Sequence, residues 1–309
     1  MSGCEWAGRR SDSAKWLKRG ETANMTAAVG PVSACRLSIR VALLLLVFQG
    51  GDATGGSPDA VSVLWREAEK SVGVPILLPS TAELPVFSQG GVIFRPLGRG
   101  ESSSTETYLR LYIDEFSKYP RSFTRAVNLE WVAFVKGLRV LDDPRAATYL
   151  RYFAAGTMAP AGGMVYDVQQ GALNENYVRW VLHHEFFHFI DDHLNRDIED
   201  QAWAELNSKD FRYTGVDAPN SSFLDHPRPG VITTYSMKSK WEDRAELFAA
   251  LFVDKAHPRL REIADADPVV RSKIRFMLRL LGRIDPSMNE PYFRKRLGAH
   301  WYGLARGKK

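Results

Sequence analysis

Cysteine is almost absent from this chain of 309 residues. The only two cysteines, Cys4 and Cys35, lie within the first 53 residues. Residues 54–309 therefore have no disulfide, no thiol nucleophile and no thiolate ligand for a metal. A metal site in this part of the chain must use His, Asp or Glu, and a segment of this length can bury its own core without cross-links.

A strong charge of one sign is also missing. The formal net charge is +5, but residues 1–53 contribute seven Lys or Arg against four acidic residues, which leaves 34 basic and 32 acidic residues in the remainder. Hydrophobic residues make up 45% and charged residues 25% of the chain, as in ordinary globular proteins, so a disordered or fibrous chain is excluded. The near balance of charge beyond residue 53 does not favour a nucleic-acid partner.

Long hydrophobic runs are missing as well. The run Val41–Phe48 is shorter than the roughly 20 residues that a membrane-spanning helix needs, but it suits the apolar region of a secretory signal. Arg36 and Arg40 precede the run, and Gly51–Ala53 offers a cleavage site of small residues. We expect translation to start at Met25 and the mature protein to be secreted or held in the periplasm or cell envelope, without a membrane span. An uncleaved membrane anchor is the alternative.

The spacing of apolar residues predicts one α+β domain over residues 54–309, after an N-terminal extension and signal peptide over 1–53. Strands are predicted at 91–95, 129–140 and 164–168, and helices at 61–70, 105–118, 174–194, 241–253 and 269–281. A short helix is expected to begin at Asp143, and residues 195–239 are expected to be irregular. Strand 164–168 fits either an edge strand that pairs with an extended peptide or an interior strand.

The segment His184-Glu185-Phe186-Phe187-His188 carries the H-E-x-x-H pattern within a helical stretch. Because residues four apart share a face of a helix, the two imidazoles can hold one zinc ion, with Glu185 close enough to accept a proton from an attacking water. The alternative is a partly buried helix with incidental histidines. His183 lies on another part of the helix and is expected to pack or to face solvent.

A catalytic zinc needs a third protein ligand, and the sequence offers several. A metzincin would have Gly at 191 and His at 194, but this chain has Asp191 and Leu194, so that pattern fails. A nearby acid, Glu199 or Glu205, could serve instead.

The remaining candidate ligand lies on the helix predicted over 241–253. Glu242 and Glu246 share one face of this helix, beside the small residues Ala245 and Ala249. Small residues allow a second helix to come close enough for a carboxylate to reach the metal. The alternative is a solvated acidic face.

Residues 181–250 resemble the gluzincin metallopeptidases related to anthrax lethal factor and the Pro-Pro endopeptidases. The resemblance rests on the H-E-x-x-H segment, on Tyr235 seven residues before Glu242, and on Glu246. It implies that His184, His188 and Glu242 bind zinc and that Glu185 is the general base. It also implies that Tyr235 stabilises the oxyanion or assists the leaving group, and that Glu246 accepts a hydrogen bond from a ligand histidine. For Tyr235, simple packing against its loop is the alternative.

Two further features are open to more than one interpretation. Asp192 lies one turn beyond the second histidine and could orient a ligand, or it could be a solvated acid at the end of the helix. Basic residues on the helix over 269–281 form a face that could touch an anionic membrane, or could simply be solvated: Arg271, Lys273, Arg275 and Arg279.

These observations predict a zincin-like α+β fold with a small mixed sheet, an active-site helix and a helical C-terminal lobe. The predicted function is that of a secreted or envelope zinc endopeptidase acting on a peptide or protein. The first alternative is a zinc hydrolase of a non-peptide amide or a cell-wall crosslink. The others are a metal-binding envelope protein without turnover, and an interaction protein whose metal motif is accidental.

Overall fold

The computed structural model describes residues 60–77, 92–95, 102–141, 151–153, 156–159, 162–169, 174–192, 194, 196–216 and 224–298. All of these residues belong to a single structural unit. The signal peptide and linker predicted before residue 60, and the short helix predicted from Asp143, lie outside the described residues.

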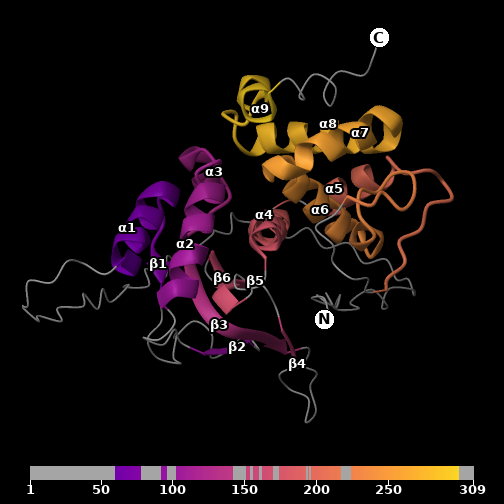
Figure 1. Cartoon of the computed structure of the whole chain (residues 1–309). Coiled ribbons are helices and arrows are strands. Elements are labelled where there is room, and N and C mark those ends of the chain that lie inside the picture. Colours follow the sequence, from indigo (N-terminus) through magenta and orange to yellow (C-terminus); the bar gives the residue numbers. More distant parts are fainter. Residues whose placement is uncertain are drawn as a thin grey trace, which may run out of the picture. The chain divides into compact units, whose positions relative to one another are not determined.

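A small mixed sheet is built around one long strand, β3 (Trp131–Leu141). Its first half pairs in parallel with β1 (Ile76–Leu77) on one side and with β6 (Gly163–Asp167) on the other. β5 (Gly156–Ala159) runs antiparallel to β6, which gives the order β1-β3-β6-β5 (Figure 1). Residues 131–135 of β3 are all buried, as expected for a strand covered on both faces.

The second half of β3 pairs with two further strands in antiparallel fashion. β2 (Val92–Arg95) and β4 (Arg151–Phe153) both pair with this half, and the register of β2 shifts between Ile93 and Arg95. The mixed character of the sheet confirms the predicted α+β class, and the predicted strands at 91–95 and 129–140 are confirmed.

The strand predicted over 164–168 is an interior strand. β6 is buried along its whole length and lies between β3 and β5. Of its two interpretations, the edge strand is therefore wrong. Among the described strands, β5 is the one that ends the sheet on this side, next to the helix that carries the histidines.

Among the described helices, α1, α2 and α3 precede β3 along the chain, and the others follow β6 (Figure 1). The bounds are α1 Ala60–Val72, α2 Ser102–Phe116, α3 Arg121–Ala126, α4 Glu175–Asp192, α5 Arg196–Ala204, α6 Lys240–Phe252, α7 His257–Ala266, α8 Pro268–Ile284 and α9 Glu290–Leu297, with 3-10 turns η3 at Tyr235–Met237 and η4 at Asp254–Ala256. The five predicted helices correspond to α1, α2, α4, α6 and α8.

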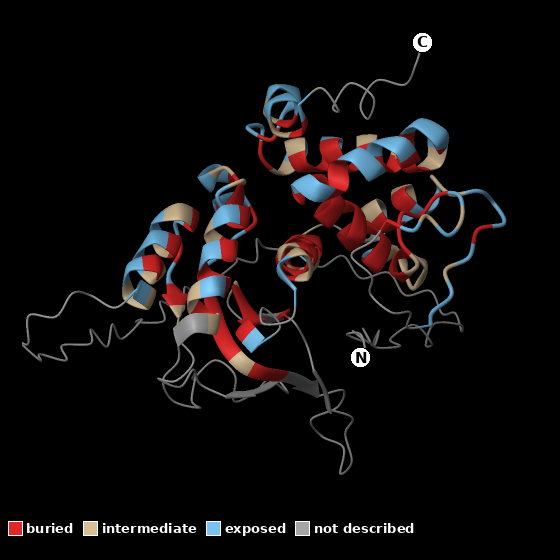
Figure 2. Ribbon diagram, in the orientation of Figure 1, coloured by how far each residue is buried: buried red, intermediate tan, exposed pale blue. Residues whose placement is uncertain are grey.

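Helix α4 is central because it packs against both halves of the fold. It contacts α2 and β5 on the sheet side and packs extensively along α6 on the other side. Figure 2 shows α6 almost entirely, and α4 in large part, in the buried colour. A helix with buried residues on several faces needs neighbouring elements to cover those faces.

The prediction of irregular structure over 195–239 is wrong in part, because this segment contains α5 and the 3-10 turn at Tyr235–Met237. Helix α5 is strongly polar, with Arg, Asp, Glu and Gln among its nine residues. It is anchored by Trp203, which is fully buried, and by Asp200, which pairs with buried Arg244 of α6. These partners are distant in sequence, so the local pattern does not reveal the helix.

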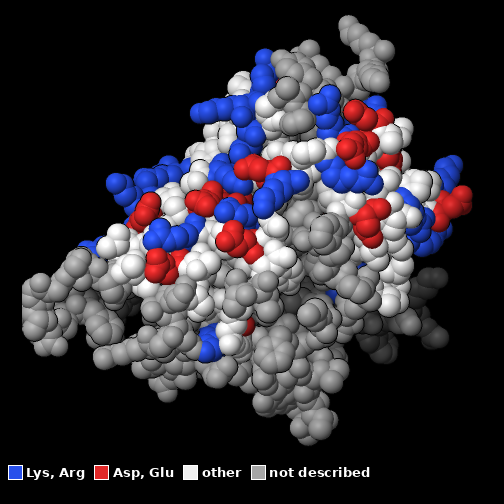
Figure 3. Space-filling model, in the orientation of Figure 1, with Lys and Arg blue, Asp and Glu red and all other residues white. Residues whose placement is uncertain are grey.

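The cationic face predicted on the helix over 269–281 is interrupted. Lys273 has an exposed fraction of only 1%, and its ammonium donates to Asp243 and to the carbonyl of Gly230. Lys273 therefore neither touches a membrane nor faces solvent. On the face shown in Figure 3, basic and acidic side chains are interspersed. No described helix is long and apolar enough to cross a membrane.

Candidate metal centre

Helix α4 places two histidines on one face. Its start is capped by Asn174, whose side-chain oxygen accepts a hydrogen bond from the amide of Asn176 at 2.9 Å. His184 and His188 lie just over one turn of helix apart, and their Nε2 atoms are 3.1 Å apart. His184 is buried and His188 is half-buried. The predicted pairing of the two rings on one face is confirmed.

Helix α6 supplies the carboxylate that meets them. The side chain of Ser239 caps this helix by accepting a hydrogen bond from the amide of Glu242 at 3.2 Å. Ala245 and Ala249 on this helix are completely buried, and α6 packs closely along α4. Oε2 of Glu242 lies 3.1 Å from Nε2 of His184 and 3.2 Å from Nε2 of His188. The solvated acidic face considered as an alternative is therefore wrong.

The other acids considered as a third ligand have different partners. Glu199 on α5 pairs with Arg283 at 2.6 Å. Glu205 accepts a hydrogen bond from Gln201 at 2.9 Å. Among the described residues, the acid that lies with the two histidines in a group able to hold a metal ion is Glu242.

The donor set fits a metal ion in its geometry and in its charge. The three ligand atoms form a nearly equilateral triangle, with sides of 3.1, 3.1 and 3.2 Å. Ligands bound at roughly 2.0–2.1 Å in a tetrahedral zinc site are about 3.3–3.4 Å apart, so little adjustment is needed. Two imidazole nitrogens and a carboxylate oxygen also repel one another through their lone pairs, unless positive charge lies between them. His184, His188 and Glu242 can therefore hold a metal ion.

Glu246 fixes the orientation of His184. Its Oε1 accepts hydrogen bonds from Nδ1 of His184 at 2.8 Å and from the indole of Trp180 at 2.7 Å, and its Oε2 accepts from Thr233 at 2.7 Å. With Nδ1 engaged in this way, Nε2 faces Glu242 and is the ring nitrogen available to a metal ion. The geometry is the one expected for Glu246. Trp180 and Thr233 were not predicted, since nothing in their local sequence marks them.

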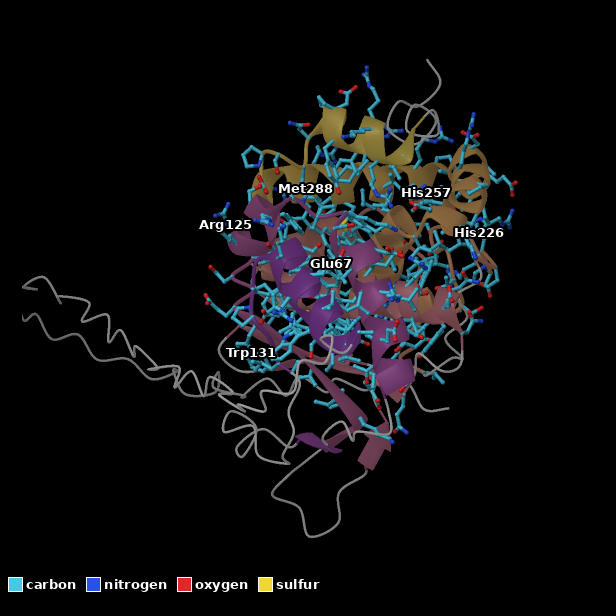
Figure 4. The ribbon with its side chains drawn as sticks, turned by 60° about the vertical axis from the view of Figure 1, so that its left-hand side comes forward. Glu67, Arg125, Trp131, His226, His257 and Met288 are labelled. Carbon is cyan, nitrogen blue, oxygen red and sulfur yellow. The ribbon has the colours of Figure 1, made fainter. Side chains whose placement is uncertain are left out.

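Tyr235 lies at the same centre. Its side chain is buried, and its hydroxyl donates to Oε1 of Glu242 at 3.2 Å. The segment that carries it is held firmly, because Asp225 accepts a hydrogen bond from the amide of Thr234 at 2.8 Å. His226, labelled in Figure 4, closes the same loop by a 2.7 Å hydrogen bond between its ring and the carbonyl of Val231. The structure thus brings Tyr235 to Glu242 and does not leave it as a packing residue of the loop.

Glu185 is a residue of α4, and its side chain faces β5 at the edge of the sheet. Its side chain is half-buried and packs against Gly156 of β5, where an added Cβ would come within 2.9 Å of Cγ of Glu185. Burial raises the pKa of its carboxyl above the ordinary value of 4.5, and the charge of Glu242 acts in the same direction. The neighbouring histidines and Lys238 oppose this shift but do not cancel it. A carboxylate of raised pKa is a better proton acceptor.

The electrostatics of the centre favour positive charge at Nε2 of His184. Burial lowers the pKa of this imidazole, but the hydrogen bonds and charges of Glu242 and Glu246 outweigh burial and raise it to about 10. Burial raises the pKa of Glu242, but its hydrogen bonds to His184 and His188 hold it well below 4.5. The two shifts describe one attraction. A metal cation would be favoured at the same point by the same carboxylates.

Neighbouring residues of α4 have other surroundings. Asp192 is exposed at the end of the helix, and its proposed role in orienting a ligand stays a prediction. Asp191 is buried and pairs with Arg244 of α6 at 2.9 Å. His183 is completely buried on the far face of the helix, where its Nε2 meets Glu115 at 2.6 Å, so the packing interpretation is confirmed and the solvent-facing one is wrong.

A buried polar network holds α6 from behind. Asp243, next to Glu242, accepts hydrogen bonds from Trp203 at 2.9 Å, from Tyr213 at 2.8 Å and from Lys273 at 2.6 Å. These donors come from α5, from the loop after it and from α8. The network therefore fixes the rotation of α6 about its own axis, and with it the direction of Glu242.

Comparison with protein-family models, with curated proteins and with solved structures found no match. The resemblance to gluzincins therefore stays a prediction from the motif residues of this chain.

Proposed function

We propose that this protein is an exported, zinc-dependent endopeptidase. The observation that carries the proposal is the triangle formed by Nε2 of His184, Nε2 of His188 and Oε2 of Glu242, with the carboxylate of Glu185 beside it. The set of two nitrogens and one oxygen suits zinc, and three protein ligands leave a coordination position for a reactant. A zinc ion held there supplies Lewis-acid chemistry, because it polarises a carbonyl group and acidifies water.

The residues of this chain would then divide the proton chemistry. Glu185 would accept a proton from the attacking water and deliver it to the leaving amine, a role that its raised pKa supports. The hydroxyl of Tyr235 can donate a hydrogen bond to the carbonyl oxygen on which negative charge develops. Glu246 keeps the ring of His184 in the tautomer that leaves Nε2 available.

The position of β5 supports a peptide as substrate. In the described part of the sheet β5 pairs on one side, with β6, and Gly156 brings its backbone against Glu185. An extended peptide that adds to the outer edge of β5 would run past the general base, and main-chain hydrogen bonds would hold it there. A compact amide substrate would not form these main-chain hydrogen bonds with β5.

Metal analysis tests the site. The full chain should bind one zinc ion, and H188A should lose it. E185Q should keep the metal, because Glu185 is outside the ligand triangle, and should lose hydrolysis. Circular dichroism of each variant controls for folding. Absence of zinc from the folded wild-type protein would refute the site.

Digestion of a peptide library tests the substrate class. The wild-type protein should cleave peptides internally, and E185Q should not. Zinc binding together with cleavage of amides or cell-wall crosslinks, and not of peptides, would replace the endopeptidase by the non-peptide hydrolase. Zinc binding without any turnover would favour the non-catalytic binding protein.

A further inference from the structure

Lys238 lies beside the metal centre but outside its ligand set. Its ammonium nitrogen is 3.5 Å from Oε1 of Glu242 and 5.4 Å from the centre of the Tyr235 ring. Only 10% of the side chain is exposed. A lysine is rarely withdrawn so far from water without an acidic partner, and one such partner here is the proposed metal ligand Glu242.

The backbone of Lys238 is fixed in this place by both of its polar groups. Its amide donates to the carbonyl of Tyr235 at 3.0 Å, and its carbonyl accepts from the amide of Gly215 at 3.0 Å. The residue adopts a relaxed helical conformation at the end of the 3-10 turn that carries Tyr235. The ammonium is therefore delivered to Glu242 from a rigid support.

Two donors thus converge on one oxygen. Oε2 of Glu242 faces the two histidines, whereas Oε1 receives the hydroxyl of Tyr235 at 3.2 Å and the ammonium of Lys238 at 3.5 Å. A phenol has a single proton to donate, so Tyr235 cannot serve Glu242 and a substrate oxygen at the same time. When Tyr235 turns to the substrate, Lys238 is the group that can keep Oε1 satisfied.

We propose that Lys238 is a positioning residue that holds Oε1 of Glu242 and so releases the hydroxyl of Tyr235 for the reaction. This inference rests on the proposed function for its catalytic part. It has a separate consequence for the metal: Lys238 and Tyr235 substitute for each other in orienting Glu242, with Oε2 directed at the ion. When one donor is removed, the other still holds Oε1 of Glu242. When both are removed, neither of these groups orients the carboxylate.

Zinc affinity, measured by competition with a chromophoric chelator, tests the substitution without any assay of activity. The proteins are the wild type, K238M, Y235F and the double variant. Each single variant should lose little affinity, and the double variant should lose about 10–100-fold, as when an outer hydrogen-bond partner of a ligand is removed. The losses should therefore exceed additivity. Additive losses would show that the two donors act independently, and would overturn the inference.

Turnover by the same four proteins, loaded with zinc, tests the release of Tyr235. Y235F should lower kcat by about 10²–10³-fold, as for removal of an oxyanion donor. K238M should lower kcat by less, with KM nearly unchanged, and should cost less in the Y235F background than in the wild type, where only its charge near Glu185 is lost. K238R should restore kcat. An equal loss from K238M with and without Tyr235 would show that Lys238 does not act through Tyr235.

K240M is the matched control. Lys240 lies two residues further on and pairs with Asp200 at 2.6 Å, so its loss removes a cation of the same segment without touching Glu242. It should leave zinc affinity and kcat unchanged. If the wild type binds zinc and cleaves peptides but the losses are additive, the role of Lys238 fails alone. If the folded wild type binds no zinc, both proposals fail.

Discussion

Replacing Gly156 with alanine should disable the general base and spare the metal. A Cβ at this position would lie 2.9 Å from Cγ and 3.3 Å from Cβ of Glu185, and 3.0 Å from Cδ1 of Tyr166. Carbon atoms in ordinary contact are about 3.5–4.0 Å apart, so overlaps of about 0.5–1 Å must be relieved. The ring of Tyr166 is completely buried and its hydroxyl donates to the carbonyl of Leu182 at 3.1 Å. Glu185, which is half-buried, will therefore be the side chain that moves.

A displacement of this size is large on the scale of catalysis. A misplacement of about 1 Å can lower a rate by about 10²-fold, and this is the loss of kcat that we expect for G156A. Overpacking should also lower the free energy of unfolding, by about 1–3 kcal/mol. Zinc affinity should stay at the wild-type value. The three atoms nearest to the added methyl group belong to Glu185 and Tyr166, and not to His184, His188 or Glu242.

The assay compares kcat, zinc affinity and chemical unfolding of four proteins: the wild type, G156A, E185Q and the double variant. Because G156A acts through Glu185, it should cost nothing further once E185Q is present. G282A, whose added Cβ meets the carbonyl of Met288 at 3.3 Å far along α8, controls for the loss of a glycine. Full kcat in G156A, or loss of zinc with kcat, would refute the placement of Glu185 against β5.

Three further predictions concern the polar groups around the two central helices. E246Q should lower zinc affinity by about 10–100-fold in a chelator competition, because a neutral amide orients His184 less firmly; unchanged affinity would contradict the role of Glu246. K273M should lower the free energy of unfolding in urea by about 3–5 kcal/mol, because it leaves Asp243 buried without its cation; a smaller loss than for K240M would contradict it. Acid should destabilise the fold, because burial lowers the pKa of His183 from 6.5 to about 4, so that the unfolded chain binds more protons in this window. The free energy of unfolding, measured in urea, should fall as the pH is lowered from 6.5 to about 4, and a flat profile over this range would refute the neutral state of His183.

The neutral state of His183 is supported by its partners. Its Nε2 can donate to Glu115, while its Nδ1 accepts the hydroxyl of Tyr119, so one tautomer satisfies both contacts without a second proton. Burial raises the pKa of Glu115, but His183 and Lys118 outweigh it and lower the pKa to about 2. Glu115 therefore adds its own loss of stability below its ordinary value of 4.5, and E115Q should remove that second phase and leave the first.

Local spacing in the sequence is sufficient for the parts of the site that lie on one helix. The separation of His184 and His188 places both rings on one face in any α-helix, and that of Glu242 and Glu246 does the same on α6. The meeting of the two helices is a tertiary event. Local spacing cannot predict that meeting, so it did not decide between Glu199, Glu205 and Glu242 as the third ligand. Glu242 was favoured by the family resemblance and not by spacing.

The residues that the sequence did not reveal have partners distant along the chain. From their local sequence, Trp180 is expected to be a core aromatic and Thr233 a loop residue. In the structure, both donate hydrogen bonds to Glu246. Lys273 has the local pattern of one member of a cationic stripe, but it is withdrawn from solvent by Asp243 and by the carbonyl of Gly230, which are 30 and 43 residues away. The interior position of β6 was undecided because a short apolar strand has the same pattern at an edge and in the middle of a sheet.

The buried charges around α6 explain why an apolar pair of helices tolerates a polar centre. Each carboxylate of this helix has its own donors: the histidines and Tyr235 for Glu242, Lys273 with two aromatic donors for Asp243, and Thr233 with Trp180 and His184 for Glu246. Removing one partner from such a group exposes an uncompensated charge, which costs more than the contact itself contributes. The same cost fixes the rotamers of these acids. Glu242 and Glu246, whose carboxylate oxygens are both engaged, have no low-energy alternative, and this rigidity is what a metal site requires of its ligands.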